Sequence, residues 1–327
     1  MLWIARKVYL LHFFSPFSFL KMAALSLVTD SSMYTLQRVP KMTGDQGKEN
    51  DLILCALANK AKDSLTKTVI FFGGDVQNYP EIMSAHQTNN LYIQWNLENT
   101  AKVLAHRFPD SLIMVVKPKE MMLNTFSIYS NFADFDENGI PTLFTNQRAL
   151  THIMKLYTNA RDAYFNNKSC DSKVDSHACS ESSSDGNDAS HMTSCAAETI
   201  EIVGFSKGCV PLNQIMFEIA TESQSSEIET FISRIKSVYW LDAGHNGRKD
   251  TWITNDSVLE KIAATKIPLF VHVSPYQVKD PNRPWIGKEE KKFVQKLKAL
   301  KANLKETKHH FDEPGSIDNH FLILTEF

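Results

Sequence analysis

The sequence predicts an α/β fold, with a mainly parallel sheet that helices cover on both faces. Short apolar segments with the character of buried strands alternate along the chain with longer amphipathic segments of helical spacing. The apolar segments at 67–72 and 111–118 end at glycine and at proline, which punctuate strands. Parallel strands need crossover helices, and these helices bury the sheet from both sides.

The composition is that of a globular protein with a sizeable core. The chain has 327 residues, of which 43% are hydrophobic and 22% are charged, and its formal net charge is −2. This balance gives no support for a nucleic-acid partner. No apolar run reaches the ~18 residues that a membrane-spanning helix needs, so we expect no integral membrane span. Five cysteines without a C-x-x-C pair argue against a disulfide framework or a zinc site.

Two segments are expected to lie outside the folded core. Residues 1–30 carry three basic side chains but no acid before Asp30, and they include a short apolar stretch. They fit a secretory signal, a mitochondrial transit peptide or an N-terminal helix that packs on the domain. Residues 166–197 are rich in Ser, Asp and Asn, and we interpret them as a disordered insertion. One domain is therefore predicted over 31–327, interrupted by this insertion.

The first half of the chain begins with strands. The segments 32–39 and 51–58 flank a turn-rich stretch, which predicts an antiparallel pair. The run "KTVIFF" predicts a buried strand that enters a loop at Gly73. The elements expected next are a helix over 96–109 with Asn96 as its cap, a strand over 111–118 and a helix over 145–165.

The second half alternates more regularly. The strands expected after the insertion are 199–205, 237–244, 267–277 and 306–313. The helices expected there are 209–220, which follows the first of these strands, and 288–305, which has an apolar stripe against a lysine-rich face. The final segment, "GSIDNHFLILTEF", is expected to begin with a loop.

A G-x-S-x-G motif lies where a predicted strand meets a predicted helix. It consists of Gly204, Phe205, Ser206, Lys207 and Gly208. In this setting the motif predicts a nucleophile elbow, a sharp turn that exposes the serine hydroxyl above the sheet. Glycines suit the flanking positions because a Cβ there would clash with the turn or its neighbours. The alternative is a tight or phosphate-binding turn without a catalytic role.

A serine nucleophile needs a base, and in this architecture the chain order is serine, acid, histidine. We favour His320, which lies beyond the last predicted strand, where a base can reach back to Ser206. His245, which follows a strand, is the competing candidate, and a structural role for both is the third possibility. Structural roles are expected for the remaining downstream histidines, His272, His309 and His310.

The acid and the oxyanion donors have several candidates. Asp280 is slightly preferred over Asp242, because an Asp-Pro in a loop after a late strand is the more usual placement. The Lys207 amide at the helix start and the amide of Asp75 or Val76 after the glycine pair are candidates for the oxyanion site. The Lys207 side chain would either favour anionic substrates or lie exposed. No metal or cofactor is implied.

Several long segments resemble the family of the human chromosome-two open reading frame sixty-nine protein. They are "GGDVQNYPEIM", "LAHRFPDS", "VGFSKGCVPLNQ", "YWLDAGHNG", "PYQVKDPNRPWIGKEEKKFV" and "NHF". The resemblance covers most of the chain from about Val69 onward, apart from the Ser-rich insertion. It implies an α/β-hydrolase-like fold, a serine nucleophile at Ser206, the "NHF" histidine at His320 and mitochondrial residence. Related "GGD" strings often carry proline at the Gly73 position.

Two functions are compatible with these features. The first is a serine hydrolase that cleaves an ester, thioester or amide of a small acyl substrate, with a Ser-His-Asp triad. The second is a non-catalytic protein of the same fold that binds a protein partner or a lipid. The resemblance favours a mitochondrial transit peptide at the N-terminus, with a secretory signal as the alternative.

Overall fold

The computed structural model describes residues 30–166 and 198–327. Residues 1–29 and 167–197 are outside the described residues. The prediction of a targeting segment and nearly all of the predicted Ser-rich insertion therefore concern residues that the structure does not describe.

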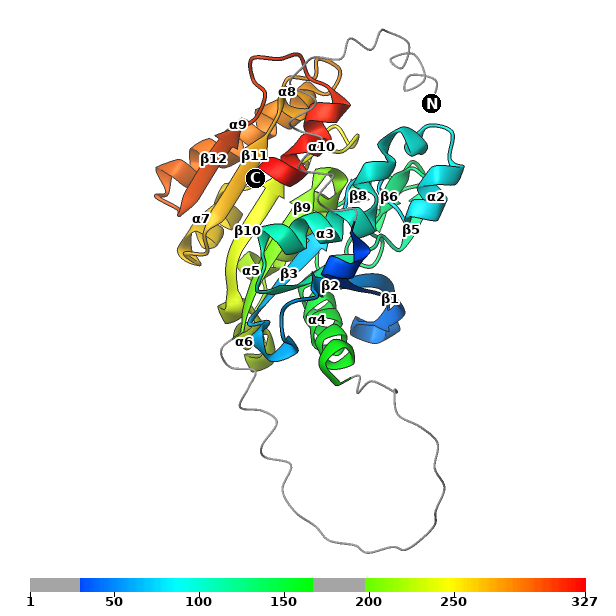
Figure 1. The fold of residues 1–327 in the computed structure, drawn as a ribbon. Helices are drawn as coiled ribbons and strands as arrows, with labels where there is room; N and C mark the ends of the chain where they lie inside the picture. Colours follow the sequence, from blue (N-terminus) through cyan, green and yellow to red (C-terminus); the bar gives the residue numbers. More distant parts are fainter. Residues whose placement is uncertain (1–29, 167–197) are drawn as a thin grey trace, which may run out of the picture.

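An eight-stranded sheet runs through the middle of the molecule (Figure 1). Its strand order is β1-β2-β4-β3-β9-β10-β11-β12. Strand β2 is antiparallel to both of its neighbours, and all other neighbouring pairs are parallel. The strands are β1 (Tyr34–Thr43), β2 (Glu49–Leu57), β3 (Lys67–Phe72), β4 (Ser111–Val116), β9 (Thr199–Phe205), β10 (Ile235–Leu241), β11 (Leu269–Val273) and β12 (Leu304–Lys308).

This topology is that of an α/β-hydrolase fold. The chain starts with an antiparallel pair at one edge, crosses from β3 to β4, and returns to the other side of β3 with β9. From there it adds β10, β11 and β12 in sequence order, each through a connection that contains a helix. The predicted mainly parallel sheet, including the antiparallel pair at its start, is confirmed.

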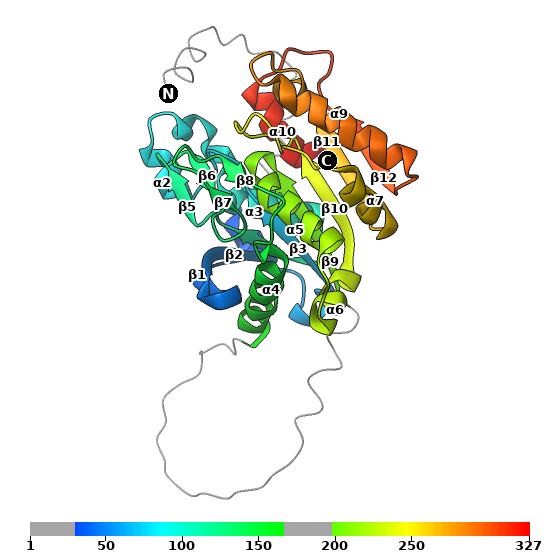
Figure 2. The same ribbon diagram turned by 180° about the vertical axis from the view of Figure 1, so that it is seen from behind.

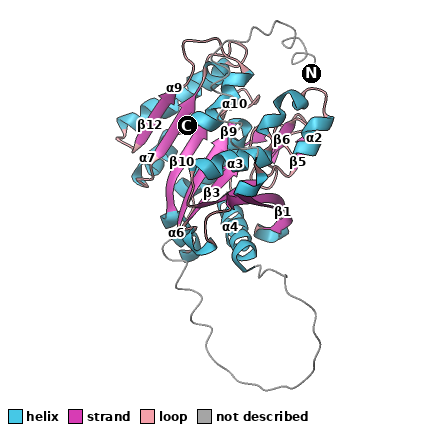
Figure 3. Ribbon diagram, viewed as in Figure 1, coloured by secondary structure: helices cyan, strands magenta, loops and turns pink. Residues whose placement is uncertain are grey.

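Helices cover both faces of this sheet (Figures 2 and 3). Side chains alternate along β3, so that Ile70 and Phe72 belong to one buried cluster and Val69 and Phe71 to the other. The first cluster includes residues of α4 (Ala149–Asn166), α5 (Cys209–Thr221), α6 (Ser226–Arg234), α7 (Asp256–Ala264) and α9 (Pro284–Ala299). The second includes residues of α3 (Leu97–Arg107) and α10 (Ile317–Glu326).

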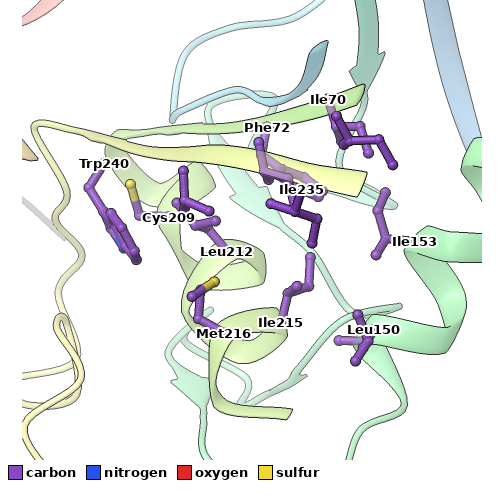
Figure 4. Close-up of a cluster of buried hydrophobic side chains, with 14 of the residues drawn as sticks. Ile70, Phe72, Leu150, Ile153, Cys209, Leu212, Ile215, Met216, Ile235 and Trp240 are labelled. Atoms are coloured by element: carbon purple, nitrogen blue, oxygen red, sulfur yellow. The ribbon is translucent and has the colours of Figure 1, made fainter. Parts of the chain in front are cut away.

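Helix α5 contributes several buried side chains to the first cluster (Figure 4). Its Leu212, Ile215 and Met216 are fully buried against Phe72 and other side chains of the sheet. Burying an aliphatic side chain of this size stabilises the fold by about 1.5–3 kcal/mol. This packing fixes the position of the residues that precede α5, which include Ser206.

The chain after β4 forms short elements that the sequence pattern did not indicate. Two small hairpins, which we call the cap hairpins, occupy the connection to α4. They are β5–β6 (Glu120–Met122 and Phe126–Ile128) and β7–β8 (Asp134–Phe135 and Pro141–Thr142). Strands of two or three residues are too short to show a period in the sequence. The other short elements are η2 (Ser31–Met33), η3 (Asp45–Gly47), η4 (Lys62–Ser64), α2 (Pro80–Ala85), η5 (Asn89–Trp95), η7 (Ser206–Gly208) and α8 (Pro275–Val278).

The C-terminal segment differs from the prediction. His320 was expected in a loop, but it lies in α10. The Ser316 hydroxyl caps this helix by accepting a hydrogen bond from the Asn319 amide at 3.1 Å. Phe321 and Leu324 are buried against the sheet, and this burial makes the short helix stable.

None of the helices within 30–166 and 198–327 combines the length and the apolar character that crossing a bilayer requires.

A buried carboxylate connects α5 to the start of α4. Glu218 of α5 is fully buried. Its two oxygens accept hydrogen bonds from the amides of Gln147, Ala149 and Leu150 at 3.1, 3.1 and 2.7 Å. The amides at a helix N-terminus have no partner within the helix, and a negative charge there interacts favourably with the helix dipole. Glu218 therefore positions α4 on α5.

We expect Glu218→Ala to lower the free energy of unfolding by about 3 kcal/mol, because it leaves three amides without their charged acceptor. Urea unfolding followed by circular dichroism measures this loss. The exposed Glu137→Ala, in a turn outside any helix, serves as the control and should change the free energy of unfolding by less than about 0.5 kcal/mol. A similar small effect for both variants would contradict the assigned role of Glu218.

Candidate active site

The turn between β9 and α5 holds Ser206 in an unusual backbone conformation. Its φ of 54° lies in the left-handed region, which costs a non-glycine residue about 1–2 kcal/mol. The flanking glycines have a steric reason. A Cβ on Gly208 would lie 2.1 Å from the carbonyl oxygen of Phe72, and one on Gly204 would lie 2.9 Å from that of Gly208. The structure therefore has a strained strand-to-helix turn where the motif predicted a nucleophile elbow, and we call this turn the elbow.

An imidazole–carboxylate pair lies over the same end of the sheet. His320 Nδ1 is 2.7 Å from Asp242 Oδ2, and Asp242 follows β10, the strand next to β9. Asp242 is fully buried and also accepts hydrogen bonds from the amide and the hydroxyl of Ser274 at 2.7 and 2.6 Å. A carboxylate only accepts, so the proton lies on Nδ1 of His320 and Nε2 is left as an acceptor.

Two aromatic rings hold the imidazole in place. Phe205 stacks on the ring of His320 with 4.5 Å between centroids, and Tyr276 stacks on it at 4.7 Å. Phe205 is the residue immediately before Ser206. The imidazole of His320 therefore lies directly beside the elbow, although it comes from the last helix of the chain.

Asp280, the acid that we preferred from the sequence, has other partners. Its Oδ2 accepts a hydrogen bond from Arg283 Nε at 2.9 Å, and its Oδ1 accepts one from the amide of Asn282 at 2.9 Å. It lies between α8 and α9, whereas Asp242 lies at the end of a central strand. The geometry favours Asp242 over Asp280 as the partner of His320.

His245, the competing base, has no carboxylate partner within residues 30–166 and 198–327. Its Nδ1 accepts a hydrogen bond from the Gly247 amide at 3.0 Å, and its Nε2 lies 3.4 Å from the carbonyl oxygen of Asp250. Burial lowers the pKa of His245 to about 4, so the ring is neutral near pH 7. These contacts give His245 a role in shaping the β10–α7 loop. His272 and His309 contact each other, with 2.9 Å between Nδ1 and Nε2.

The loop after β3 lies against Ser206 and is tightly fastened. A Cβ on Gly74 would lie 2.7 Å from Ser206 Cβ. Tyr129 and Ser127 donate hydroxyl hydrogen bonds to the carbonyls of Gly73 and Gly74, both at 2.8 Å. The Gly74 amide donates to the side chain of Gln77 at 2.9 Å. These bonds leave the loop little freedom to move.

The two predicted oxyanion donors of this loop differ in availability. The Val76 amide donates to the carbonyl of Thr125 in the first cap hairpin at 2.6 Å, so it is already used. The Asp75 amide donates to no acceptor among the described residues. The Lys207 amide lies in the first turn after the elbow and has no partner within the helix. Of the candidates, Asp75 and Lys207 therefore keep free amides, and Val76 does not.

The Lys207 side chain is neither exposed nor free. Only 5% of the residue is exposed, and Nζ donates a hydrogen bond to the carbonyl of Gly139 at 2.9 Å. The ammonium also lies 5.5 Å from the ring centroid of Phe135. Burial lowers the pKa of Lys207, and the nearby Asp75 and Asp136 partly oppose this effect. Lys207 thus connects the elbow to the second cap hairpin.

Ser274, which binds both oxygens of Asp242, was not predicted from the sequence. A signal for it was present. Ser274 directly follows β11, and polar residues at the carboxyl ends of neighbouring parallel strands meet at one edge of a sheet. Ser127 and Tyr129, which fasten the glycine loop, had no comparable signal because they lie in and after a strand of three residues. In the part of the chain that the structure describes, no group of three or more His, Cys, Asp or Glu side chains is arranged to hold a metal ion.

Comparison with known proteins identifies the family of this chain. The family model for C2orf69 matches residues 38–199 and 166–303. The mouse mitochondrial protein C2orf69 homolog is 37% identical over 313 residues, which cover 89% of this chain and 86% of the mouse protein. The human mitochondrial protein C2orf69 is 40% identical over 279 residues, which cover 78% of this chain and 72% of the human protein.

Among solved structures, esterase Est22 has a TM-score of 0.47 and 10% identity, and the match covers 94% of this chain and 82% of the esterase. At this level the fold assignment depends on the strand order described above. The names of the mouse and human relatives confirm the mitochondrial localisation. Together, the family model and these two relatives show that this chain belongs to the C2orf69 family.

Proposed function

We propose that this protein is a serine hydrolase that cleaves an ester, thioester or amide. The single observation that carries the proposal is the Asp242–His320 hydrogen bond. The imidazole of His320 stacks on Phe205, the residue before the strained Ser206. An acyl-transfer triad has three parts, which are a strained serine, an oriented imidazole and a buried carboxylate.

The proposed reaction begins with attack of Ser206 Oγ on the substrate carbonyl. His320 Nε2 takes the hydroxyl proton, and Asp242 stabilises the imidazolium through the Nδ1 hydrogen bond. The amides of Lys207 and Asp75 bind the oxyanion of the tetrahedral intermediate. Collapse of the intermediate breaks the bond to the leaving group, which receives the proton from His320. Water then attacks the acyl-serine by the same sequence of steps.

Substrate access requires the cap hairpins to move. Only 7% of Ser206 is exposed, and Lys207 holds the second cap hairpin through Gly139. Ile140 of the same hairpin approaches the β10–α7 loop, where a Cβ on Gly247 would lie 3.0 Å from its side chain. We therefore include in the proposal a local opening of the second cap hairpin, in which Lys207 Nζ releases the carbonyl of Gly139.

The low exposure of Ser206 is also the observation that favours the second candidate function. A non-catalytic protein of this fold would keep the elbow as architecture and would not need a path to the serine. The two candidates differ in the reactivity of one hydroxyl, which can be measured directly.

We expect the purified protein to react with a fluorophosphonate probe, because the probe phosphonylates a serine that a neighbouring imidazole activates. Ser206→Ala should abolish the labelling. Ser233→Ala, at an exposed position of α6, should leave it unchanged. In-gel fluorescence measures the labelling, and a thermal melt checks that each variant is folded. Labelling that persists in folded Ser206→Ala would refute the assignment, and absence of labelling in all variants would support the non-catalytic candidate.

The two candidate acids give a second prediction. We expect Asp242→Asn to lower kcat/KM for an activated ester by about 10³-fold or more, because the amide can no longer hold the proton on Nδ1 of His320. Asp280→Asn should stay within about threefold of the wild type, since its partners are Arg283 and Asn282. Initial rates with a 4-nitrophenyl ester provide the comparison. A larger loss for Asp280→Asn than for Asp242→Asn would reverse the assignment.

A further inference from the structure

We propose that the Asp75 side chain selects substrates that carry a hydrogen-bond donor close to the scissile carbonyl. The proposed donor is a hydroxyl on the acyl chain. This inference rests on the proposed hydrolase function, because it assigns a substrate class to the same site. It goes beyond that function in giving Asp75 a role for its side chain in addition to its amide.

The position of Asp75 supports this role. It follows Gly74, whose backbone lies against Ser206. Its carboxyl group is close enough to Lys207 and His320 for their charges to act on it, although burial has the larger effect and raises the pKa of Asp75. Its carboxyl also acts on Tyr276, the ring that stacks on His320. A carboxyl group is thus located inside the candidate active site, in addition to that of Asp242.

The hydrogen bonds of Asp75 leave one oxygen open. Oδ1 accepts a hydrogen bond from the Ser127 amide at 2.7 Å, which fixes the orientation of the side chain. No described residue donates a hydrogen bond to Oδ2. Asp75 is only partly buried, so a hydrogen-bond partner from outside the chain can reach Oδ2. Beside a nucleophile, a hydroxyl group of the substrate can be that partner.

The proposed role of the Asp75 amide also determines where on the substrate the hydroxyl must lie. If the Asp75 amide binds the oxyanion, its carboxyl group lies only a few bonds away from the carbonyl that reacts. A donor bound there must lie near that carbonyl, at the second or third carbon of the acyl chain. A site built to bind a substrate hydroxyl discriminates strongly against an analogue that lacks it, because its own polar group is then left unpaired.

The competing specificity group is the ammonium of Lys207, which would favour an anionic substrate. Two contacts argue against it. Nζ already donates to the carbonyl of Gly139, and the ammonium lies over the ring of Phe135. These contacts direct Lys207 to the second cap hairpin.

The test compares three 4-methylumbelliferyl esters on the full-length protein. The 3-hydroxybutyrate ester carries the donor, the isovalerate ester replaces the hydroxyl by a methyl group, and the adipate monoester carries a negative charge. For the wild type we expect kcat/KM to be at least about tenfold higher for 3-hydroxybutyrate than for isovalerate. The adipate monoester should be the poorest of the three substrates.

Asp75→Asn keeps an oxygen that can accept from Ser127, so it tests the acceptor without removing the fastening of the loop. We expect it to bring the ratio of the two neutral esters close to one. Asp136→Asn is the matched control, because Asp136 is the other carboxylate that acts on Lys207 and lies in the second cap hairpin. It should keep the wild-type ratio. The ratio is insensitive to a general loss of folded protein, which would lower both rates alike.

Three outcomes overturn the inference. A wild-type ratio near one, or an unchanged ratio in Asp75→Asn, removes the role of Asp75. A preference for the adipate monoester that Lys207→Met abolishes assigns specificity to Lys207. Fluorophosphonate labelling separates these results from a failure of the hydrolase proposal. A labelled Ser206 with a ratio near one refutes only the inference, whereas an unlabelled protein without esterase activity refutes both.

Discussion

The fold and the site both depend on the left-handed turn at Ser206. This backbone conformation is unfavourable for serine, and the surrounding structure holds it because α5 is packed so closely on β3. Gly208 lies against the carbonyl of Phe72, where no side chain fits. The same close approach brings the end of β3 and the loop after it next to the serine. A less compact turn would separate the serine hydroxyl from the free amides of Asp75 and Lys207.

Much of this arrangement could be predicted from local sequence patterns. The run "KTVIFF" is β3 to the residue, and the G-x-S-x-G motif lies at the strand–helix junction where it was expected. The partner of His320 was harder to predict, because Asp242 and Asp280 both lie at or after the ends of predicted strands. The order β9-β10-β11 places Asp242 beside the elbow and next to Ser274. That order is a tertiary property, and no local pattern contains it.

Helix α10 shows how tertiary packing can override a local expectation. Its short polar start suggested a loop, but Ser316 caps the helix and Phe321 is buried. The ring of Phe321 stacks on Trp95, with 5.7 Å between centroids. The helix that carries His320 is therefore anchored by the residue next to it. Removing the imidazole from the elbow would require this stacked pair to separate.

The cap hairpins and the proposed oxyanion site share their attachments. The first hairpin is bound through the Val76 amide, and the second through Lys207 Nζ. Val76 follows Asp75, whose amide is proposed to bind the oxyanion. Lys207 carries the other proposed amide. Val76 has a φ of 76°, which is strained for a β-branched residue, and its hydrogen bond to Thr125 holds it there.

Opening either hairpin therefore releases a constraint on a proposed oxyanion donor. The Asp242–His320 hydrogen bond joins the end of β10 to α10, and neither element belongs to the hairpins. Closure of the cap and completion of the proposed catalytic site are, in this geometry, the same event.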